Sequence, residues 1–270
     1  MRCAHPRESV TPMAFVQIAR EGRLTIVTLD RPEVLNALHP PAHHELSAVF
    51  DQFAGDPKQW VAIVTGSGDR AFCAGNDLKY RAALGRQAMP VTGFAGLTSR
   101  FDLHKPVIAA VNGLALGGGF ELALACDLAI ADERAMFGLP EVRVGLAALG
   151  GGLQRLSRQI GAKLAMEIAL TGRRIGAPEL LRHGALNAVV PAGEALARAR
   201  NYAAEILAAA PLAVRASKHA MLRGLEHASL QDAISEQDQL PTVIAMRASE
   251  DALEGPRAFA QKRAPRWLAR

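Results

Sequence analysis

The stretch that most constrains the fold of this chain covers residues 105–121. It contains Val107–Val111, a continuous apolar run typical of a strand that is buried on both faces. Asn112-Gly113 follows, and both residue types tolerate the positive φ of a tight turn. Gly117-Gly118-Gly119 then leads into residues 120–126, whose apolar character predicts a buried helix. The stretch therefore predicts a strand, a turn and a helix that begins at glycines.

A helix that begins at glycines can also serve as a binding site. The first N–H groups of a helix have no acceptor within it, so bare backbone there can bind a developing negative charge. Glu121 lies about one helical turn after Gly118, which places an acid or base beside those donors. Close packing of a strand on a helix needs the same glycines, so this pattern alone fits both interpretations.

The remaining apolar segments predict an α/β fold with parallel strand pairing, because strands and helices alternate. Residues 40–53 begin with two prolines and predict a helix, and residues 94–103 also have helical spacing. Residues 85–92 lack an apolar period and predict a mobile loop. Strands are predicted at 15–18, 24–29, 60–65, 107–111, 128–131 and 186–190, the first two as a hairpin.

From residue 162 onward the chain is rich in alanine and amphipathic. Helices are predicted over 162–170, 194–209, 212–225, 230–246 and 250–261. We therefore divide the chain into an N-terminal segment expected to be disordered (1–13), a sheet-containing core (14–200) and a helical C-terminal region (201–270).

Composition excludes several classes of protein. Half of the 270 residues are hydrophobic, but the longest apolar run, residues 114–131, is interrupted by glycines, Glu121 and Asp127, so we expect no membrane span. Residues 1–13 are polar and do not resemble a secretory signal. Cys3, Cys73 and Cys126 have no metal-ligand spacing, so we expect no metal, reduced thiols and a cytoplasmic location.

The net charge of +5 indicates a basic surface that could attract a phosphorylated small molecule or RNA. Only 5% of the residues are aromatic, and none alternate with basic residues as a stacking platform would require. We therefore expect no nucleic-acid partner, and an RNA-binding protein remains the alternative from another class.

Three stretches carry the chemistry together: 71–79, 117–119 and 137–141. Taken alone, the first predicts a surface loop and the third a turn with a solvated acid. In this order and spacing they closely resemble the crotonase superfamily, the enoyl-CoA hydratases and isomerases, from about Phe15 to the C-terminus. Residues 93–98, 118–125 and 249–256 resemble the carnitinyl-CoA dehydratase branch of that family in particular.

The resemblance implies a crotonase-like fold of ββα units, with C-terminal helices that pack on neighbouring subunits in a homotrimer or a dimer of trimers. It also implies an oxyanion hole formed by the backbone N–H groups of Asn76 and Gly118 around a CoA thioester carbonyl. Hydration of a 2-enoyl thioester builds enolate charge on that oxygen, and one such donor contributes about 3–4 kcal/mol.

Glu121 and Glu141 match the two carboxylates of the hydratases in this family. We assign Glu121 as the base that activates water and Glu141 as the acid that protonates Cα, with the roles reversed in dehydration. Isomerases of the family commonly lack one or both carboxylates. The pair therefore favours a hydratase or dehydratase, with an enoyl-CoA isomerase on the same scaffold as the alternative.

The resemblance implies that coenzyme A is bound as part of the substrate, with no separate cofactor. The candidate phosphate partners are Lys79, Lys262 and Arg263, of which Lys79 is favoured, because the two C-terminal residues fit a solvated surface equally well. In the family, some of this phosphate contact comes from an adjacent subunit. Leu149 stands where hydratases commonly have Gly, or Asp in the carnitinyl branch, so it makes the pocket more apolar and less suited to a trimethylammonium group. The implied substrate-binding residues are Arg31, Val34, Ala74, Asp77, Leu78, Lys79, Gly117, Leu149 and Lys262.

Two other motifs fail on inspection. Residues 61–71 fit a strand followed by GxGxxA, but no acidic residue ends a second strand about 20 residues later, so we do not expect a dinucleotide site. His43-His44-Glu45 lacks the second histidine of a zinc helix, and we expect both histidines to face solvent.

Overall fold

The computed structural model describes residues 11–85 and 87–270. Residues 1–10, most of the segment expected to be disordered, lie outside the described residues. The first described element is β1 (Thr11–Pro12), which pairs antiparallel with β2 (Val16–Glu21). The disorder of the N-terminal segment and the domain boundary at residue 200 stay predictions.

Within the described residues, the larger sheet has seven strands in the order β1-β2-β3-β4-β6-β8-β11. The predicted hairpin of β2 and β3 is antiparallel, and the pairs from β3 through β11 are parallel. The α/β class and the parallel pairing are therefore confirmed. The strands after β2 are β3 (Leu24–Leu29), β4 (Val61–Gly66), β6 (Val107–Val111), β8 (Leu128–Asp132) and β11 (Ala188–Val190).

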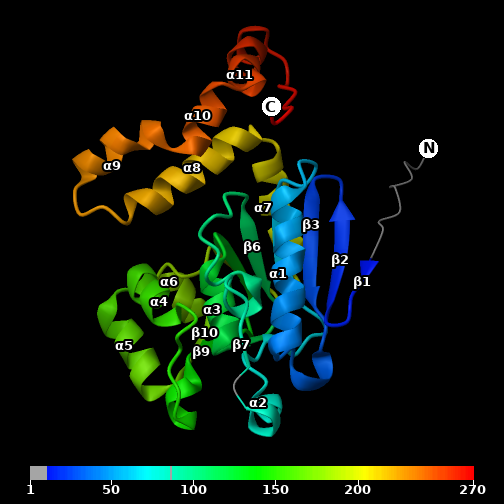
Figure 1. Cartoon of the computed structure of the whole chain (residues 1–270), viewed down its shortest axis with the longest axis vertical. Helices are drawn as coiled ribbons and strands as arrows, with labels where there is room; N and C mark the ends of the chain where they lie inside the picture. Colours follow the sequence, from blue (N-terminus) through cyan, green and yellow to red (C-terminus); the bar gives the residue numbers. More distant parts are fainter. Residues whose placement is uncertain (1–10, 86) are drawn as a thin grey trace.

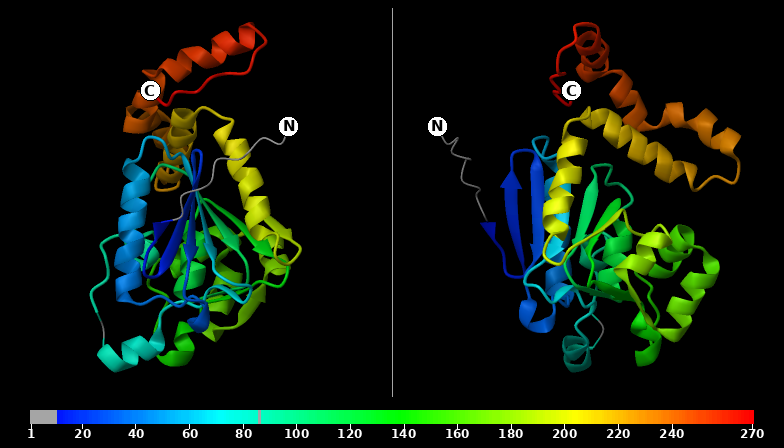
Figure 2. Two further views of the ribbon diagram at one scale, coloured as in Figure 1. Left: turned by 90° about the vertical axis from the view of Figure 1, so that its right-hand side faces the viewer. Right: turned by 180° about the vertical axis from the view of Figure 1, so that it is seen from behind.

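Helices cover both faces of this sheet. Figures 1 and 2 show α1 (Pro40–Gly55) on one face and α7 (Ala195–Leu207) on the other. In β4, Ala62 and Val64 belong to the core beneath α1, whereas Val61 and Ile63 belong to the core beneath α7. Burial on both faces explains why these strands are continuous apolar runs rather than alternating ones.

A smaller sheet in the order β10-β9-β7-β5 corrects the prediction of a surface loop at 71–79. Residues 71–73 form a buried strand, and α2 (Leu78–Leu84) follows, capped where the Asp77 side chain accepts a hydrogen bond from Tyr80 N at 3.1 Å. Strands of three residues are too short to show an alternating pattern. They are β5 (Ala71–Cys73), β7 (Leu114–Leu116), β9 (Met136–Gly138) and β10 (Arg174–Gly176).

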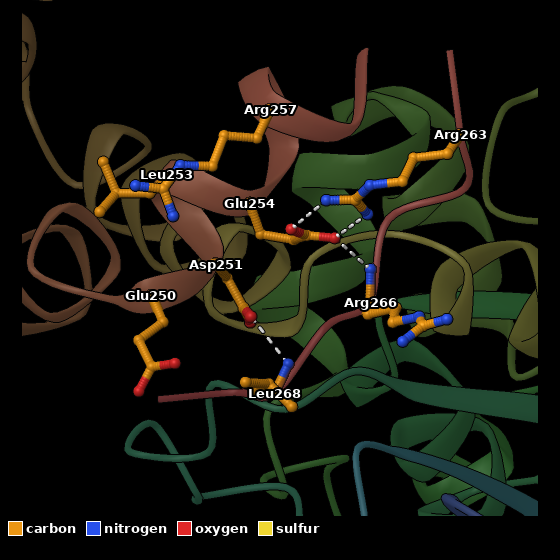
Figure 3. A pocket seen from close by; sticks show the side chains of 8 residues that line it. All are labelled: Glu250, Asp251, Leu253, Glu254, Arg257, Arg263, Arg266 and Leu268. Carbon is orange, nitrogen blue, oxygen red and sulfur yellow. Dashed lines mark hydrogen bonds and ion pairs between the residues drawn. The ribbon is translucent and has the colours of Figure 1, made fainter. Parts of the chain in front are cut away.

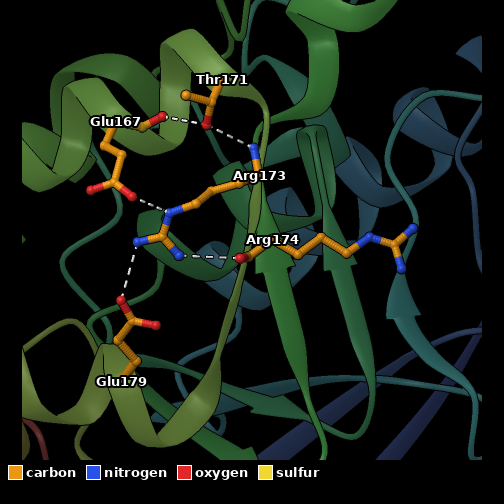
Figure 4. Close-up of polar contacts among 5 residues, drawn as sticks. All are labelled: Glu167, Thr171, Arg173, Arg174 and Glu179. Atoms are coloured by element: carbon orange, nitrogen blue, oxygen red, sulfur yellow. Dashed lines mark hydrogen bonds and ion pairs between the residues drawn. The ribbon is translucent and has the colours of Figure 1, made fainter.

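The helix predicted at the central glycines is α3 (Gly118–Ala125), and three further helices follow: α4 (Gly152–Ile160), α5 (Ala162–Thr171) and α6 (Ala177–Arg182). Arg173, directly before β10, holds this part together (Figure 4). Its guanidinium bonds Glu167 of α5 at 2.6 Å and Glu179 of α6 at 3.1 Å. One arginine therefore links two helices across the start of a strand.

The helix predicted at 94–103 is wrong. Only the short 3-10 turn η2 (Phe94–Gly96) forms, and Ala95 within it has φ +52°. The backbone of this turn is held by side chains instead: Ala95 N donates to His43 Nδ1 at 3.1 Å, and Phe94 N donates to Thr98 Oγ1 at 2.9 Å. Glycines at 93 and 96, both with positive φ, allow this path and prevent a regular helix.

The C-terminal helices project from the core as an arm (Figures 1 and 2). The single helix predicted at 230–246 is wrong, because Pro241 has no N–H to continue it and holds Leu240 extended at ψ 130°. Figure 3 shows the tail folded back on α11, where Arg263 bonds Glu254 at 2.6 and 2.8 Å. The arm comprises α8 (Pro211–Gly224), α9 (Leu230–Glu236), α10 (Pro241–Arg247) and α11 (Glu250–Ala260).

Candidate active site

Glu121 lies in the first turn of α3 and is 4% exposed. Its Oε1 accepts a hydrogen bond from Gly152 N at 2.9 Å, at the start of α4. Burial raises the pKa of Glu121, and the amides of Gly152 and Gly150 oppose that rise, followed by the charge of Arg155. A Cβ on Gly150 would stand 2.6 Å from Glu121 Oε2, so the glycine turn wraps the carboxylate closely.

Glu141 lies in the 3-10 turn η3 (Pro140–Val144), and its carboxyl group reaches the turn that precedes α3. A Cβ on Gly117 would stand 2.8 Å from Glu141 Oε1. Its other oxygen, Oε2, is buried and has no hydrogen-bond partner among the described residues. Burial raises the pKa of Glu141 to about 7, and the charge of Glu121 adds to that rise. The two glutamates therefore share one buried site in different environments.

The loop with Asn76 and the turn with Gly118 lie side by side. Gly75, with φ +95°, sits so close that a Cβ there would be 2.7 Å from Leu116 O and 3.2 Å from Gly118 N. Asn76 is held by a β-bridge to Leu38, through Leu38 N to Gly75 O at 2.8 Å and Asp77 N to Leu38 O at 2.9 Å. Neither Asn76 N nor Gly118 N donates to another group in residues 11–85 and 87–270.

Two aromatic side chains at this site were not predicted from the sequence. Phe94 packs so closely against Gly118 that any side chain there would collide with its ring. His43, expected to face solvent, is fully buried and packs against Phe94 with ring centroids 4.5 Å apart and ring planes tilted by 57°. Burial lowers the pKa of His43 to about 4, so the ring is neutral and accepts the hydrogen bond from Ala95 N. His44 is exposed, as expected.

The predicted CoA-binding segments come together beside this loop. Arg31 forms an ion pair with Asp77 at 3.1 Å, and Ala74 N donates to Leu35 O at 3.0 Å, so the turn with Val34 lies against the segment 74–77. Burial by itself would raise the pKa of Asp77, but the hydrogen bond from Tyr80 N and the hydrogen bond and charge of Arg31 together lower it.

The other predicted substrate contacts lie farther out. Leu78 and Lys79 begin α2 and are exposed. Leu149 directly precedes Gly150 but is 77% exposed, so in the single chain its side chain does not bury itself against the carboxylates. Lys262 follows α11, which Figure 1 shows at the opposite end of the molecule from α2. Within one chain, Lys262 is not brought to the other site residues.

Two groups around Glu121 were also missed. From the sequence, residues 150–152 were interpreted only as the start of a helix, yet their backbone surrounds the Glu121 carboxylate. Arg155, one turn into α4, donates from Nη2 to Thr98 O at 2.8 Å. The only signal in the sequence was the glycine triplet itself, whose bare backbone suits an anion.

Two absences apply to the residues that the structure describes. These residues contain no group of three or more His, Cys, Asp or Glu side chains that could hold a metal ion. Over the same residues, no helix has the length and apolar character needed to cross a membrane.

Comparison with known proteins agrees with the observed fold. The sequence model for enoyl-CoA hydratase/isomerase matches residues 19–270. The chain is 44% identical over 260 residues to the carnitinyl-CoA dehydratase of Proteus mirabilis (strain HI4320), covering 94% of this chain and 98% of that protein. It is 42% identical over 261 residues to the carnitinyl-CoA dehydratase of Escherichia coli (strain K12), with the same coverage.

Solved structures give the same result. The crystal structure of enoyl-CoA hydratase from Mycobacterium tuberculosis H37Rv matches with a TM-score of 0.89 and 40% identity, covering 96% of this chain and 100% of that chain. A putative short chain enoyl-CoA hydratase from Novosphingobium aromaticivorans matches with a TM-score of 0.85 and 35% identity, covering 96% of this chain and 99% of that chain. By sequence and by fold, this chain belongs to the enoyl-CoA hydratase/isomerase family.

Proposed function

We propose that this protein catalyses the reversible addition of water to 2-enoyl-CoA thioesters, giving 3-hydroxyacyl-CoA. The observation that carries the proposal is the pair of neighbouring carboxylates, buried Glu121 in the first turn of α3 and half-buried Glu141 against Gly117, whose Oε2 is buried. Hydration needs one group to take a proton from water and another to deliver a proton to C2. Membership of the enoyl-CoA hydratase/isomerase family supports the same reaction.

The thioester oxygen would bind the backbone N–H groups of Asn76 and Gly118. Both amides lack an acceptor among the described residues, and Gly75 brings their segments into contact. Negative charge develops on this oxygen as water adds, so donors that are already in place favour the transition state over the substrate. Main-chain donors make the role of Asn76 independent of its side chain.

The proton steps follow from the two environments. Ionised Glu121 takes a proton from water as the water oxygen bonds to C3, and the electrons of the C2–C3 double bond move to the thioester oxygen as an enolate. The enolate then re-forms the carbonyl while C2 takes the proton of Glu141. Transfer of one proton from Glu121 to Glu141 restores the enzyme, and the net change is addition of one water. Three groups support this division: the amides at Gly152 and Gly150 and the charge of Arg155 favour ionised Glu121.

The CoA portion would run along the segments held by the Arg31–Asp77 ion pair. Val34 and Ala74 flank that pair, Leu78 offers exposed apolar surface, and exposed Lys79 would contact a phosphate group. Lys262 could take part only from a second copy of the chain, since α11 lies at the other end of its own molecule. We therefore propose a homotrimer, alone or paired into a hexamer, as the functional form.

For the acyl group, relatives at 42–44% identity named carnitinyl-CoA dehydratase support crotonobetainyl-CoA as a substrate. Leu149 argues for a more apolar acyl group, because it offers no charge to a trimethylammonium group. A comparison of kcat/KM for crotonobetainyl-CoA and crotonyl-CoA decides between these two preferences.

The test measures hydration of both thioesters by the wild type, Glu121→Gln and Glu141→Gln. The loss of enoyl thioester absorbance monitors the reaction. We expect turnover by the wild type and a fall of about 10²–10⁴-fold in kcat for each variant, the usual contribution of general acid or base catalysis. Glu133→Gln, an exposed acid on the core, is the control and should retain wild-type rates. A wild type that binds CoA but hydrates no 2-enoyl-CoA would overturn the proposal.

An enoyl-CoA isomerase remains the second candidate, because one carboxyl group can carry a proton between C2 and C4. Glu141 suits that task, with an unpartnered Oε2 and a pKa raised to about 7 by burial. If Glu121→Gln retains Δ3–Δ2 isomerisation at wild-type rates while no hydration is seen in either enzyme, isomerisation is the reaction.

A further inference from the structure

Arg155 packs against the glycine turn that holds Glu121. Its backbone N donates to Gly151 O at 3.0 Å, and its guanidinium folds back over Gly151, leaving no room for a side chain there. In the same turn, Gly152 N donates to Glu121 Oε1 at 2.9 Å. Arg155 therefore packs on the stretch of backbone that binds the carboxylate of the proposed base, Glu121.

A second contact connects Arg155 to the oxyanion side of the site. Its Nη2 donates to Thr98 O at 2.8 Å, and Thr98 Oγ1 accepts from Phe94 N at 2.9 Å. The Phe94 ring in turn lies against Gly118. One guanidinium thus connects the turn around Glu121 with the segment that packs on Gly118.

The charged groups around Glu121 come from two elements. Burial raises the pKa of Glu121, and the charge of Arg155 of α4 opposes that rise; Glu121 in turn adds to the rise that burial causes in the pKa of Glu141 of η3. Arg155 also faces the thiol of Cys126, which burial keeps protonated by raising its pKa. A guanidinium remains charged under these conditions even when burial lowers its pKa.

We propose that Arg155 is a positioning residue that keeps Glu121 ionised and its binding turn in place, so that the single proton of the glutamate pair stays on Glu141. The inference rests on the proposed function and deepens it: the division into base and acid would be set by a cation that touches neither substrate nor carboxylate. Without that charge, the amides at positions 150 and 152 are what remains, among the described residues, to oppose the cost of burying Glu121 as an anion.

The experiment compares Arg155→Gln and Arg155→Lys with Arg158→Gln, an exposed arginine on the same helix. For hydration of crotonyl-CoA, we expect the acid limb of the kcat profile to move up by about one pH unit in Arg155→Gln. At pH values on that limb kcat should therefore fall about tenfold, with less than a threefold change in KM. Arg155→Lys should return the limb to its wild-type position, and Arg158→Gln should not move it.

A second measurement does not depend on activity. ¹³C NMR of glutamate-labelled full-length protein, with Glu121 assigned through Glu121→Gln, should show Glu121 titrating at higher pH in Arg155→Gln than in the wild type. An unmoved Glu121 titration, or equal loss of kcat in both Arg155 variants with unshifted limbs, would overturn the inference. A wild type without hydratase activity would overturn the proposed function alone, because the titration still tests the effect of Arg155 on Glu121.

Discussion

At the scale of single residues, the site depends on placing carboxylates where an anion is unfavourable. Glu141 illustrates this most clearly: its Oε2 is buried without a partner among the described residues, and burial raises its pKa to about 7. Such a group destabilises the fold whenever it is ionised. It is retained, in our interpretation, because a carboxyl group that holds its proton near neutral pH can deliver it to C2.

The sign of this effect gives a stability prediction. Because the folded-state pKa of Glu141 lies above the unfolded value of 4.5, its contribution to stability is present below pH 4.5 and is lost as pH rises toward 7. Glu141→Gln should therefore be more stable than the wild type at pH 8 by about 1–3 kcal/mol, and the gain should disappear at pH 4. Urea unfolding at both pH values measures it. If the wild type and Glu141→Gln had equal free energies of unfolding at pH 8, ionised Glu141 would not destabilise the fold, which would contradict the prediction.

At the scale of elements, the site is a junction of turns. The Gly117 turn lies at φ +53° and ψ −125°, a conformation that only glycine adopts readily, and it leads from β7 into α3. The carboxyl group of Glu141 occupies the space where a side chain would begin. This turn therefore sets the direction of the helix that carries Glu121, and it leaves the space that the carboxyl group of Glu141 occupies.

Gly117→Ala tests that junction against Gly161→Ala as a control. Gly161 has an equally restricted backbone, at φ +85° and ψ +149°, but open space where a Cβ would stand. Both substitutions should cost about 1–3 kcal/mol of stability through backbone strain. Only Gly117→Ala should also lower kcat for hydration, by at least about tenfold, because it displaces Glu141. Similar kcat values for the two variants would contradict the role of this turn.

How much could be predicted from the sequence also depends on element length. β4, β6 and β8 were predicted because each is a buried apolar run. The smaller sheet was not, since three-residue strands have no period. The pairing of Glu121 with Gly152, 31 residues away, is a tertiary contact that no local pattern contains. Similarly, the burial of His43 follows from the irregular turn at Phe94, where helical spacing predicted the wrong element.

At the scale of the whole molecule, the arm of helices carries large exposed apolar side chains. Leu225 and Leu230 are each 76% exposed and Phe259 is 87% exposed, which is typical of surfaces that meet a partner. The arm is also tied to the core, where Lys218 of α8 bonds Asp127 at 2.7 Å and Lys105 O at 3.0 Å. A homotrimer would cover these residues and could bring Lys262 of one copy to the site of another.

Size-exclusion chromatography with light scattering tests this assembly. We expect a mass of three or six times the 28.7 kDa chain for the wild type. The double variant Leu225→Asp/Leu230→Asp should shift toward the monomer, because buried unpaired charges at an interface are costly. An exposed core substitution, Arg20→Glu, should leave the mass unchanged. A monomeric wild type would contradict the proposed assembly and with it any role for Lys262.

The central claim is that two backbone amides hold one thioester oxygen while two glutamates face the alkene carbons. A crystal structure with a bound 3-oxoacyl-CoA, which cannot take up water, tests it most directly. We expect the thioester oxygen about 3 Å from both Asn76 N and Gly118 N, with the carboxyl groups of Glu121 and Glu141 beside C3 and C2. A thioester oxygen bound elsewhere, or either carboxyl group turned away from these two carbons, would contradict the account.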